Sequence, residues 1–133
     1  MKFFLGFFLL ATLAFAGPRL LVLSGTVTNT TGDVSAPARL ELSIDGENVS
    51  ARLVTFPPLT GTGALTGRLL DGWCELTGQL DGGFALKFFG VLNAHDFRGT
   101  YTATPENGGM QYGRFVFAPA ATNPPSAAAP PQG

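Results

Sequence analysis

The residues of this chain that could do chemistry gather in one stretch, LTGRLLDGWCELTGQLDGGF, residues 65–84. It holds the only cysteine, Cys74, and three carboxylates, Asp71, Glu75 and Asp81, which are the residue types of a nucleophile with acid and base partners. The alternative is architecture, because Asp before Gly is favoured in turns and a lone buried cysteine is an inert thiol. We favour architecture and predict no catalytic residue in this stretch.

The second candidate is His95 followed by Asp96, in the short link NAHD. Histidine is the natural general base at neutral pH, but adjacent residues do not orient one another, and no nucleophile can be placed beside them. His95 and Cys74, with twenty residues between them, also lack the spacing of metal ligands. We therefore expect a protein that is not an enzyme and has neither cofactor nor metal. An uncharacterised hydrolase or isomerase is the alternative.

Both ends of the chain differ from its middle. Residues 1–16, MKFFLGFFLLATLAFA, place a lysine before an apolar run and end in Ala-Phe-Ala, the pattern of a secretory signal peptide cleaved near Ala16-Gly17. Residues 119–133 are rich in Ala and Pro, which predicts a disordered tail. Residues 17–118 then form one secreted or periplasmic domain, with no transmembrane segment in the mature chain. The Ala/Pro tail and the use of Arg over Lys suggest a bacterial protein.

The charge balance excludes one class of partner. The chain has 8 Lys and Arg against 9 Asp and Glu, a net charge of −1, without runs of one sign. A nucleic-acid groove needs a basic stripe, so no nucleic-acid partner is expected. Because a single cysteine cannot form an internal disulfide, the core must hold the exported domain together unaided.

Apolar and polar residues alternate through residues 20–118, and clusters of Asp, Asn, Gly and Pro separate the runs. This pattern is typical of strands joined by turns. The short connections favour antiparallel pairing of consecutive strands, an up-and-down meander. The predicted strands are Leu20–Asn29, Ala38–Ile44, Val49–Phe56, Gly63–Leu70, Trp73–Leu80, Phe84–Leu92, Phe97–Thr104 and Met110–Ala118.

The turns set the pairing of neighbouring strands. LTGRLLDGW is nearly repeated as LTGQLDGGF eleven residues later, which is one strand plus its turn. A two-residue Asp-Gly turn after Leu70 places Leu70 opposite Trp73, and Arg68 opposite Glu75, on the outer surface. The same construction at three other hairpins places large side chains opposite small ones on one inner face. Four hairpins that agree support the register, because a slip of one residue would reverse every side chain.

The resulting inner face is apolar and is interrupted by glycines 25, 67, 78, 90, 99 and 113. Inward-facing glycines favour a tightly curled sheet, so we predict an all-β fold of eight antiparallel strands in an up-and-down meander closed into a small barrel. A two-sheet β-sandwich is the alternative. The predicted inner side chains are Leu21, Leu23, Val27, Leu40, Leu42, Ile44, Val49, Ala51, Leu53, Leu65, Leu69, Cys74, Leu76, Leu80, Phe84, Leu86, Phe88, Leu92, Phe97, Tyr101, Phe115 and Phe117.

Three segments, LSGTVTNTTG, FRGTYTAT and YGRFVF, together with the eight meandering strands, resemble the avidin and lipocalin type of small up-and-down barrel, the calycins, or one of the secreted bacterial β-barrel domains similar to them. The resemblance covers residues 20–118 and implies a barrel that encloses a small ligand. Avidins line the barrel mouth with several tryptophans. Here the one tryptophan, Trp73, is predicted to point outward, so biotin binding is not implied.

Two functions follow from this architecture. The first is a binding module that takes a small hydrophobic or lipid-like molecule in its apolar interior or at its mouth. Two prolines in the segment FPPLTGT, residues 56–62, stop the third strand, and this loop is either a lid or a connection whose apolar side chain plugs the core. The predicted ligand-binding residues are Phe56, Leu59, Phe97 and Tyr101.

The second function is a structural or interaction module of the bacterial cell envelope. The outward-facing positions are more apolar than a lone exported monomer needs, which predicts a homo-oligomer or docking to another envelope protein. The predicted interface residues are Leu70, Trp73, Phe89 and Val91.

Overall fold

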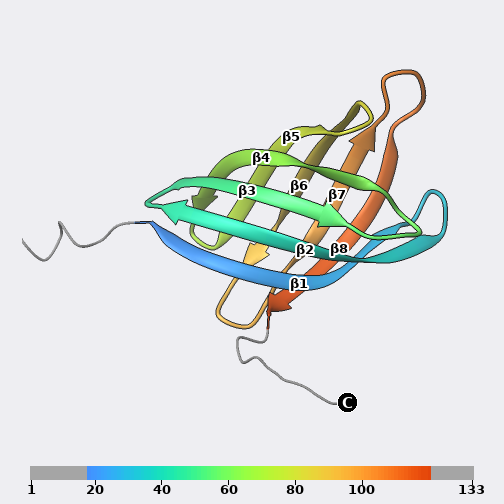
Figure 1. Cartoon of the computed structure of the whole chain (residues 1–133). Coiled ribbons are helices and arrows are strands. Elements are labelled where there is room, and N and C mark those ends of the chain that lie inside the picture. Colours follow the sequence, from blue (N-terminus) through green and yellow to red (C-terminus); the bar gives the residue numbers. More distant parts are fainter. Residues whose placement is uncertain (1–17, 121–133) are drawn as a thin grey trace, which may run out of the picture.

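The computed structural model describes residues 18–120, which form eight antiparallel β-strands closed into one barrel (Figure 1). Each strand pairs with the next along the chain, and the last pairs with the first, so the barrel prediction is confirmed and the two-sheet sandwich is excluded. The strands are β1 (Arg19–Asn29), β2 (Val34–Asp45), β3 (Asn48–Thr55), β4 (Gly61–Leu70), β5 (Trp73–Leu80), β6 (Phe84–Leu92), β7 (Phe97–Thr104) and β8 (Gln111–Pro119).

The described range covers nearly all of the predicted domain. β8 continues through Pro119, and the amide of Ala120 still donates to the carbonyl of Val22 at 2.8 Å, slightly beyond the expected end at residue 118. The predicted signal peptide, and the predicted tail beyond Ala120, lie outside the described residues. No helix long and apolar enough to cross a membrane occurs within residues 18–120.

The Asp-Gly turns set the register as predicted. Leu70 pairs with Trp73 across the β4–β5 turn. The φ angles at Asp71 and Gly72 are 52° and 85°, and two consecutive positive values are what a type I′ hairpin turn requires. The pairings predicted at the other three hairpins are also observed. The strands therefore present the predicted alternation of inner and outer side chains.

The inward glycines occur where neighbouring strands come too close for a side chain. A methyl group at Gly67 would lie 1.6 Å from the backbone oxygen of Glu75, and one at Gly25 would lie 1.9 Å from that of Val116. Glycine at these positions lets the sheet coil tightly enough to close. The curvature inferred from the glycine pattern is thus present in the backbone.

The core is apolar, and among the described residues no polar or charged residue is buried. All of the predicted inner side chains are buried or packed against the core, and Ala36, Ala38 and Ala103 join them. Four aromatic rings are fully enclosed; the ring centroids of Phe88 and Phe115 lie 4.5 Å apart. The other two enclosed rings are Phe97 and Phe117.

β2 begins earlier than predicted, at Val34 rather than Ala38, although Pro37 lies within it. Proline is tolerated there because β3 ends opposite Ala38, so residues 34–37 have a strand neighbour only on the β1 side. The carbonyl of Pro37 still accepts a hydrogen bond from the amide of Phe56 at 3.0 Å. Pro37 thus lies inside β2, in the part of the strand that pairs with β1 but extends beyond β3.

The ion pairs on the outer face differ from the predicted one. Arg68 does lie opposite Glu75 in the ladder, but its guanidinium binds Glu47 in the β2–β3 turn. Glu75 instead forms an ion pair with Lys87 of β6, with 3.0 Å between Lys87 Nζ and Glu75 Oε2. Long side chains can reach diagonal neighbours as easily as directly opposed ones, so the ladder alone does not choose the partner.

Candidate ligand-binding mouth of the barrel

In an up-and-down barrel the loops alternate between the two ends. The loops of residues 30–33, 56–60, 81–83 and 105–110 surround one end, which we call the mouth. The turns of residues 46–47, 71–72 and 93–96 surround the other, which we call the far end, and the described chain also begins and ends there. Figure 1 shows the two groups of connections on opposite sides of the barrel.

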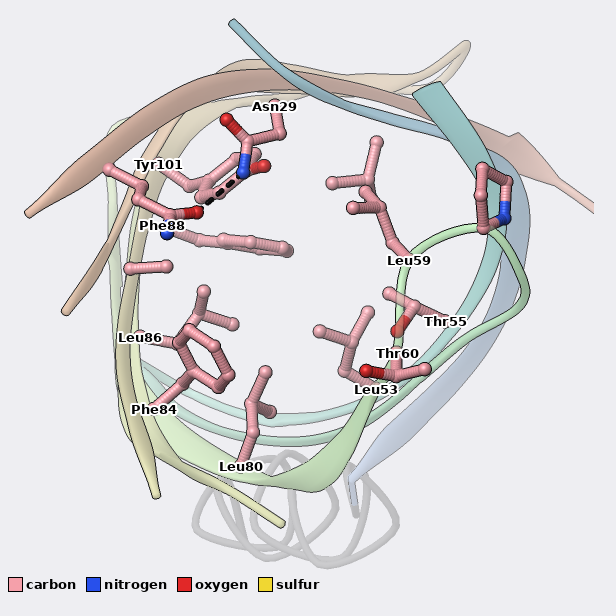
Figure 2. Close-up of a pocket in the computed structure, with 14 residues that line it drawn as sticks. Asn29, Leu53, Thr55, Leu59, Thr60, Leu80, Phe84, Leu86, Phe88 and Tyr101 are labelled. Carbon is pink, nitrogen blue, oxygen red and sulfur yellow. Dashed lines mark hydrogen bonds between the residues drawn. The ribbon is translucent and has the colours of Figure 1, made fainter. Parts of the chain in front are cut away.

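A cavity of about 180 Å³ opens at the mouth (Figure 2). Inner residues of β1, β3, β5, β6 and β7 supply its apolar wall, and the loop of residues 56–60 borders it. No Asp, Glu, Lys or Arg lines it. The apolar lining is Val27, Leu53, Leu59, Leu80, Phe84, Leu86, Phe88 and Ala103, with Pro58 at the rim.

Three of the five polar side chains of the lining form hydrogen bonds within the chain. Asn29 Nδ2 donates to Gln111 Oε1 at 2.6 Å, which links β1 to β8 across the seam where the barrel closes. Thr55 Oγ1 donates to the carbonyl of Gly61 at 2.7 Å and holds the base of the 56–60 loop. These bonds leave little free hydrogen-bonding capacity in that part of the rim.

Tyr101 differs from the other polar lining residues because it is buried, whereas Thr60, whose hydroxyl also forms no hydrogen bond within residues 18–120, is exposed. The side chain of Tyr101 is only 6% exposed, yet among residues 18–120 its hydroxyl forms no hydrogen bond. A methyl group at Gly113, directly opposite, would lie 2.3 Å from the ring, so this glycine makes room for the tyrosine. Burial raises the pKa of Tyr101, and the hydroxyl therefore stays protonated at neutral pH, when it can both donate and accept.

The loop of residues 56–60 presents one apolar side chain to the interior and another to solvent. Leu59 packs against the core and points into the ring of lining side chains, and its amide donates to the carbonyl of Phe56 at 3.2 Å (Figure 2). Phe56 is 43% exposed and does not line the cavity. Leu59 thus partly plugs the mouth, the arrangement expected of a connection that closes the core.

The structure brings together two of the four predicted ligand-binding residues, Leu59 and Tyr101. Phe97, expected beside the mouth, is instead fully enclosed at the far end, where it begins β7 opposite Leu92 and Phe117. The alternation of strand direction could have located Phe97. The 56–60 loop follows the end of β3, whereas Phe97 stands at the start of β7, and in an up-and-down barrel β3 ends where β7 also ends, at the end opposite to Phe97. Asn29 and Gln111 were not foreseen, since their contact depends on the closure of β1 against β8.

The far end also has a hollow, of about 430 Å³. Its lining includes the apolar strand-end side chains Leu21, Leu69 and Leu92. Arg19 and Pro119, near the two ends of the described range, border it. Below it the interior is filled by the enclosed phenylalanine rings, which separate it from the mouth cavity.

The predicted interface residues do lie together on the outer face of β4, β5 and β6. The rings of Trp73 and Phe89 stack at a centroid distance of 5.1 Å with an interplanar angle of 14°, and they are 50% and 45% exposed. Leu70 pairs with Trp73, which pairs in turn with the half-buried Val91. We call these four residues the outer patch.

The groups considered for catalysis are separated from one another. Cys74 is fully buried, and burial raises the pKa of its thiol to about 11, so it is no thiolate at neutral pH. The carboxylate of Asp96 binds Arg98 at 2.7 Å rather than His95. The amides of His95 and Asp96 both donate to the side chain of Asn93, which is turn geometry. No cluster of three or more His, Cys, Asp or Glu suited to a metal occurs in the described part of the chain.

The structure is an eight-stranded, antiparallel, up-and-down β-barrel, which is consistent with a calycin-like architecture. Comparisons with known protein families, with curated proteins and with solved structures found no significant match. The function of this chain is therefore inferred from its own residues, and the mouth cavity and the outer patch are the two features that bear on it.

Proposed function

We propose that this protein is an exported, non-enzymatic binding protein that holds one small apolar molecule in the mouth cavity. The observation that carries the proposal is a cavity of about 180 Å³ with an apolar and aromatic lining, reached from one end of the barrel past Leu59. Burial of apolar ligand surface supplies the driving force. The predicted signal peptide of residues 1–16 and the resemblance to avidin- and lipocalin-type barrels agree with this role.

The size of the cavity narrows the ligand. Drug-sized ligands occupy pockets of roughly 300–1,000 Å³, whereas an apolar cavity of about 150 Å³ is enough for benzene. The mouth therefore suits a molecule with a single ring or a short branched chain. A long acyl chain would need the space that Phe88 and Phe115 fill, so we narrow the expected hydrophobic or lipid-like ligand to a small one.

The test is a titration of the mature domain with fluorobenzene followed by ¹⁹F NMR. We expect saturable binding of one molecule per chain. In the variant Ala103→Phe the new ring occupies the cavity, so binding should fall at least tenfold while the domain stays folded. The matched control is Thr102→Phe, which adds the same ring at the neighbouring outward position and should bind normally. If all three proteins bind equally, or if none binds, this function is refuted.

The outer patch supports a second candidate function, self-association of the barrel through this surface. Trp73 and Phe89 form a flat, half-exposed apolar surface of the kind found at interfaces. Two ion pairs beside it are formed within the chain, Lys87–Glu75 at 3.0 Å and Arg98–Asp96 at 2.7 Å. A second copy that docks on the outer patch would therefore cover these four side chains as ion pairs and not as isolated charges.

Sedimentation velocity over a range of protein concentrations tests this second function. We expect a monomer–dimer equilibrium that shifts toward monomer in Trp73→Ser, while the exposed substitution Tyr112→Ser outside the outer patch has no effect. A wild-type monomer at all concentrations would exclude self-association and leave another envelope protein as the partner of this surface.

A further inference from the structure

The charged residues around the mouth are all acidic. Its four loops contain three of them, Asp33, Asp81 and Glu106, each of them exposed. Neither these loops nor the two strand residues flanking each loop include a Lys or Arg. The nearest cations along the strands are Arg52, Lys87 and Arg114, each exposed and each the fourth residue from the mouth end of its strand, β3, β6 and β8.

These three carboxylates form no ion pair within residues 18–120, whereas two carboxylates at the far end do. At the far end, Glu47 binds Arg68 and Asp96 binds Arg98. The mouth thus carries a negative potential that nearby side chains do not cancel, and a charged ligand approaching it would be attracted or repelled according to its sign.

Independently of these charges, the cavity wall contains a polar group that lacks a partner. The hydroxyl of Tyr101 is buried against the cavity and forms no hydrogen bond within the described chain. The two side-chain amides of the lining, Asn29 and Gln111, are bonded to each other. Burying a hydroxyl without a hydrogen-bond partner costs free energy. A ligand atom that forms a hydrogen bond to the hydroxyl removes this cost, which strengthens binding. The ligand should therefore carry one polar atom beside its apolar body.

We infer that the mouth selects small aromatic amines, with the ring held among Phe84, Phe88 and Leu86 and the ammonium group directed toward the mouth. There Tyr101 Oη accepts one of the N–H hydrogens, and the loop carboxylates stabilise the positive charge. This inference rests on the proposed binding at the mouth and names its ligand class. An anionic ligand of the same shape is disfavoured because no cation faces the cavity.

The experiment compares three molecules of similar shape by calorimetric titration at low salt: 2-phenylethylamine, 2-phenylethanol and 3-phenylpropionate. We expect the amine to bind about tenfold more tightly than the acid, with the alcohol between them, and the ratio to shrink severalfold at high salt as the loop charges are screened. Replacing the three mouth acids, Asp33→Asn with Asp81→Asn and Glu106→Gln, should bring the ratio near one without changing the affinity for the alcohol.

Two single variants complete the test. Tyr101→Phe should weaken the amine and the alcohol by about two- to tenfold, because each loses its hydrogen bond. Glu47→Gln removes an acid of the far end and should leave the amine-to-acid ratio unchanged. If 2-phenylethanol binds but the amine and the acid bind equally, the amine inference is wrong and the proposed function stands. If none of the three molecules binds, both fail.

Discussion

The mouth and the far end of this barrel are built by the same eight strands but are filled differently. Toward the far end, Phe97 and Phe117 are fully enclosed, and the hollow of about 430 Å³ is lined by the strand-end side chains Leu21, Leu69 and Leu92. Toward the mouth, the lining is formed by leucines and the half-buried Phe84, and a cavity of about 180 Å³ remains. One continuous apolar face thus forms a packed core of aromatic rings in one part of the barrel and the wall of a cavity in another.

The charges follow the same division. At the far end, two of the turn carboxylates form ion pairs, Glu47 with Arg68 and Asp96 with Arg98, while Asp71 is in no ion pair within residues 18–120. The mouth has three exposed carboxylates and, within the described chain, no ion pair to them. We therefore assign most of the stability to the far end and ligand selection to the mouth. The following predictions test that assignment, from the largest expected effect to the smallest.

The largest difference is expected between two phenylalanines. Phe97→Ala should lower the free energy of unfolding by about 3–5 kcal/mol, because it removes an enclosed ring whose centroid lies 4.7 Å from that of Phe115. Phe84→Ala, at the half-buried edge of the cavity, should lower it by less than about 2 kcal/mol. Urea unfolding monitored by circular dichroism measures both. Equal losses would remove the distinction between a packed end and an open one.

The next effect is a loss of stability in alkaline solution. Burial raises the pKa of Cys74 from 9.0 to about 11, so the folded state favours the protonated thiol. This contribution is complete below about pH 9 and disappears as the pH rises toward 11, and at about 1.4 kcal/mol for each pKa unit it amounts to roughly 2–3 kcal/mol. Urea unfolding at pH 7, 9, 10 and 11 measures the decline.

Cys74→Ala provides the control for the alkaline loss. This variant is less stable throughout, but its stability should fall less steeply between pH 9 and 11 than that of the wild type, because only the buried phenol of Tyr101 then contributes. If the free energy of unfolding fell equally steeply with pH in the two proteins, the thiol of Cys74 would not be shielded from solvent, contrary to its position in the core.

The plug at the mouth predicts a smaller effect on stability but a change in ligand size. Leu59→Ala should cost about 1 kcal/mol, since the side chain is only partly buried, and should enlarge the cavity so that 2-naphthol binds where the wild type excludes it. Phe56→Ala, on the same loop but exposed, should change neither property. Thermal unfolding and fluorescence titration provide the two measurements. Naphthol binding to the wild type would show that Leu59 does not limit access.

The smallest effect concerns single charges at the two ends. Glu47→Gln breaks the exposed pair with Arg68 and should lower stability by a few tenths of a kcal/mol. Asp33→Asn removes an unpaired acid at the mouth and should leave stability unchanged; asparagine accepts the positive φ of 56° found there. Differential scanning calorimetry of the two variants side by side resolves the contrast. A larger loss from Asp33→Asn would indicate a partner for the mouth acid.

Most of the fold could be predicted from local patterns. Alternation of apolar and polar residues located the strands, and the Asp-Gly turn at residues 71–72 set a register that the structure reproduces. The exceptions are instructive. The second strand was predicted to begin at Ala38, but it begins at Val34 and includes Pro37, which is tolerated because β3 ends opposite Ala38. Arg68 was matched with Glu75 because the two residues are opposite in the strand pairing, but the pairing does not show how far a long side chain extends, and Arg68 binds Glu47.

The site was predicted only in part. Leu59 and Tyr101 reach the mouth, as expected from the loop of residues 56–62 and the inner face. Phe97 does not, because the direction of its strand places it at the far end. The hydrogen bond from Asn29 to Gln111 spans 82 residues and exists only because β1 closes against β8. The assignment of these residues to ligand binding remains a prediction that the titrations above test.

What the sequence by itself determined is the set of strands, their antiparallel order and the face that each side chain occupies. These properties depend on a period of two residues and on turn conformations, both of which are local. The tertiary structure alone decided which part of the interior would be filled by aromatic rings and where the mouth cavity would remain. That outcome depends on how the rings of Phe88, Phe97 and Phe115 from three different strands share one volume, and closure of the barrel, not any single strand, sets that volume.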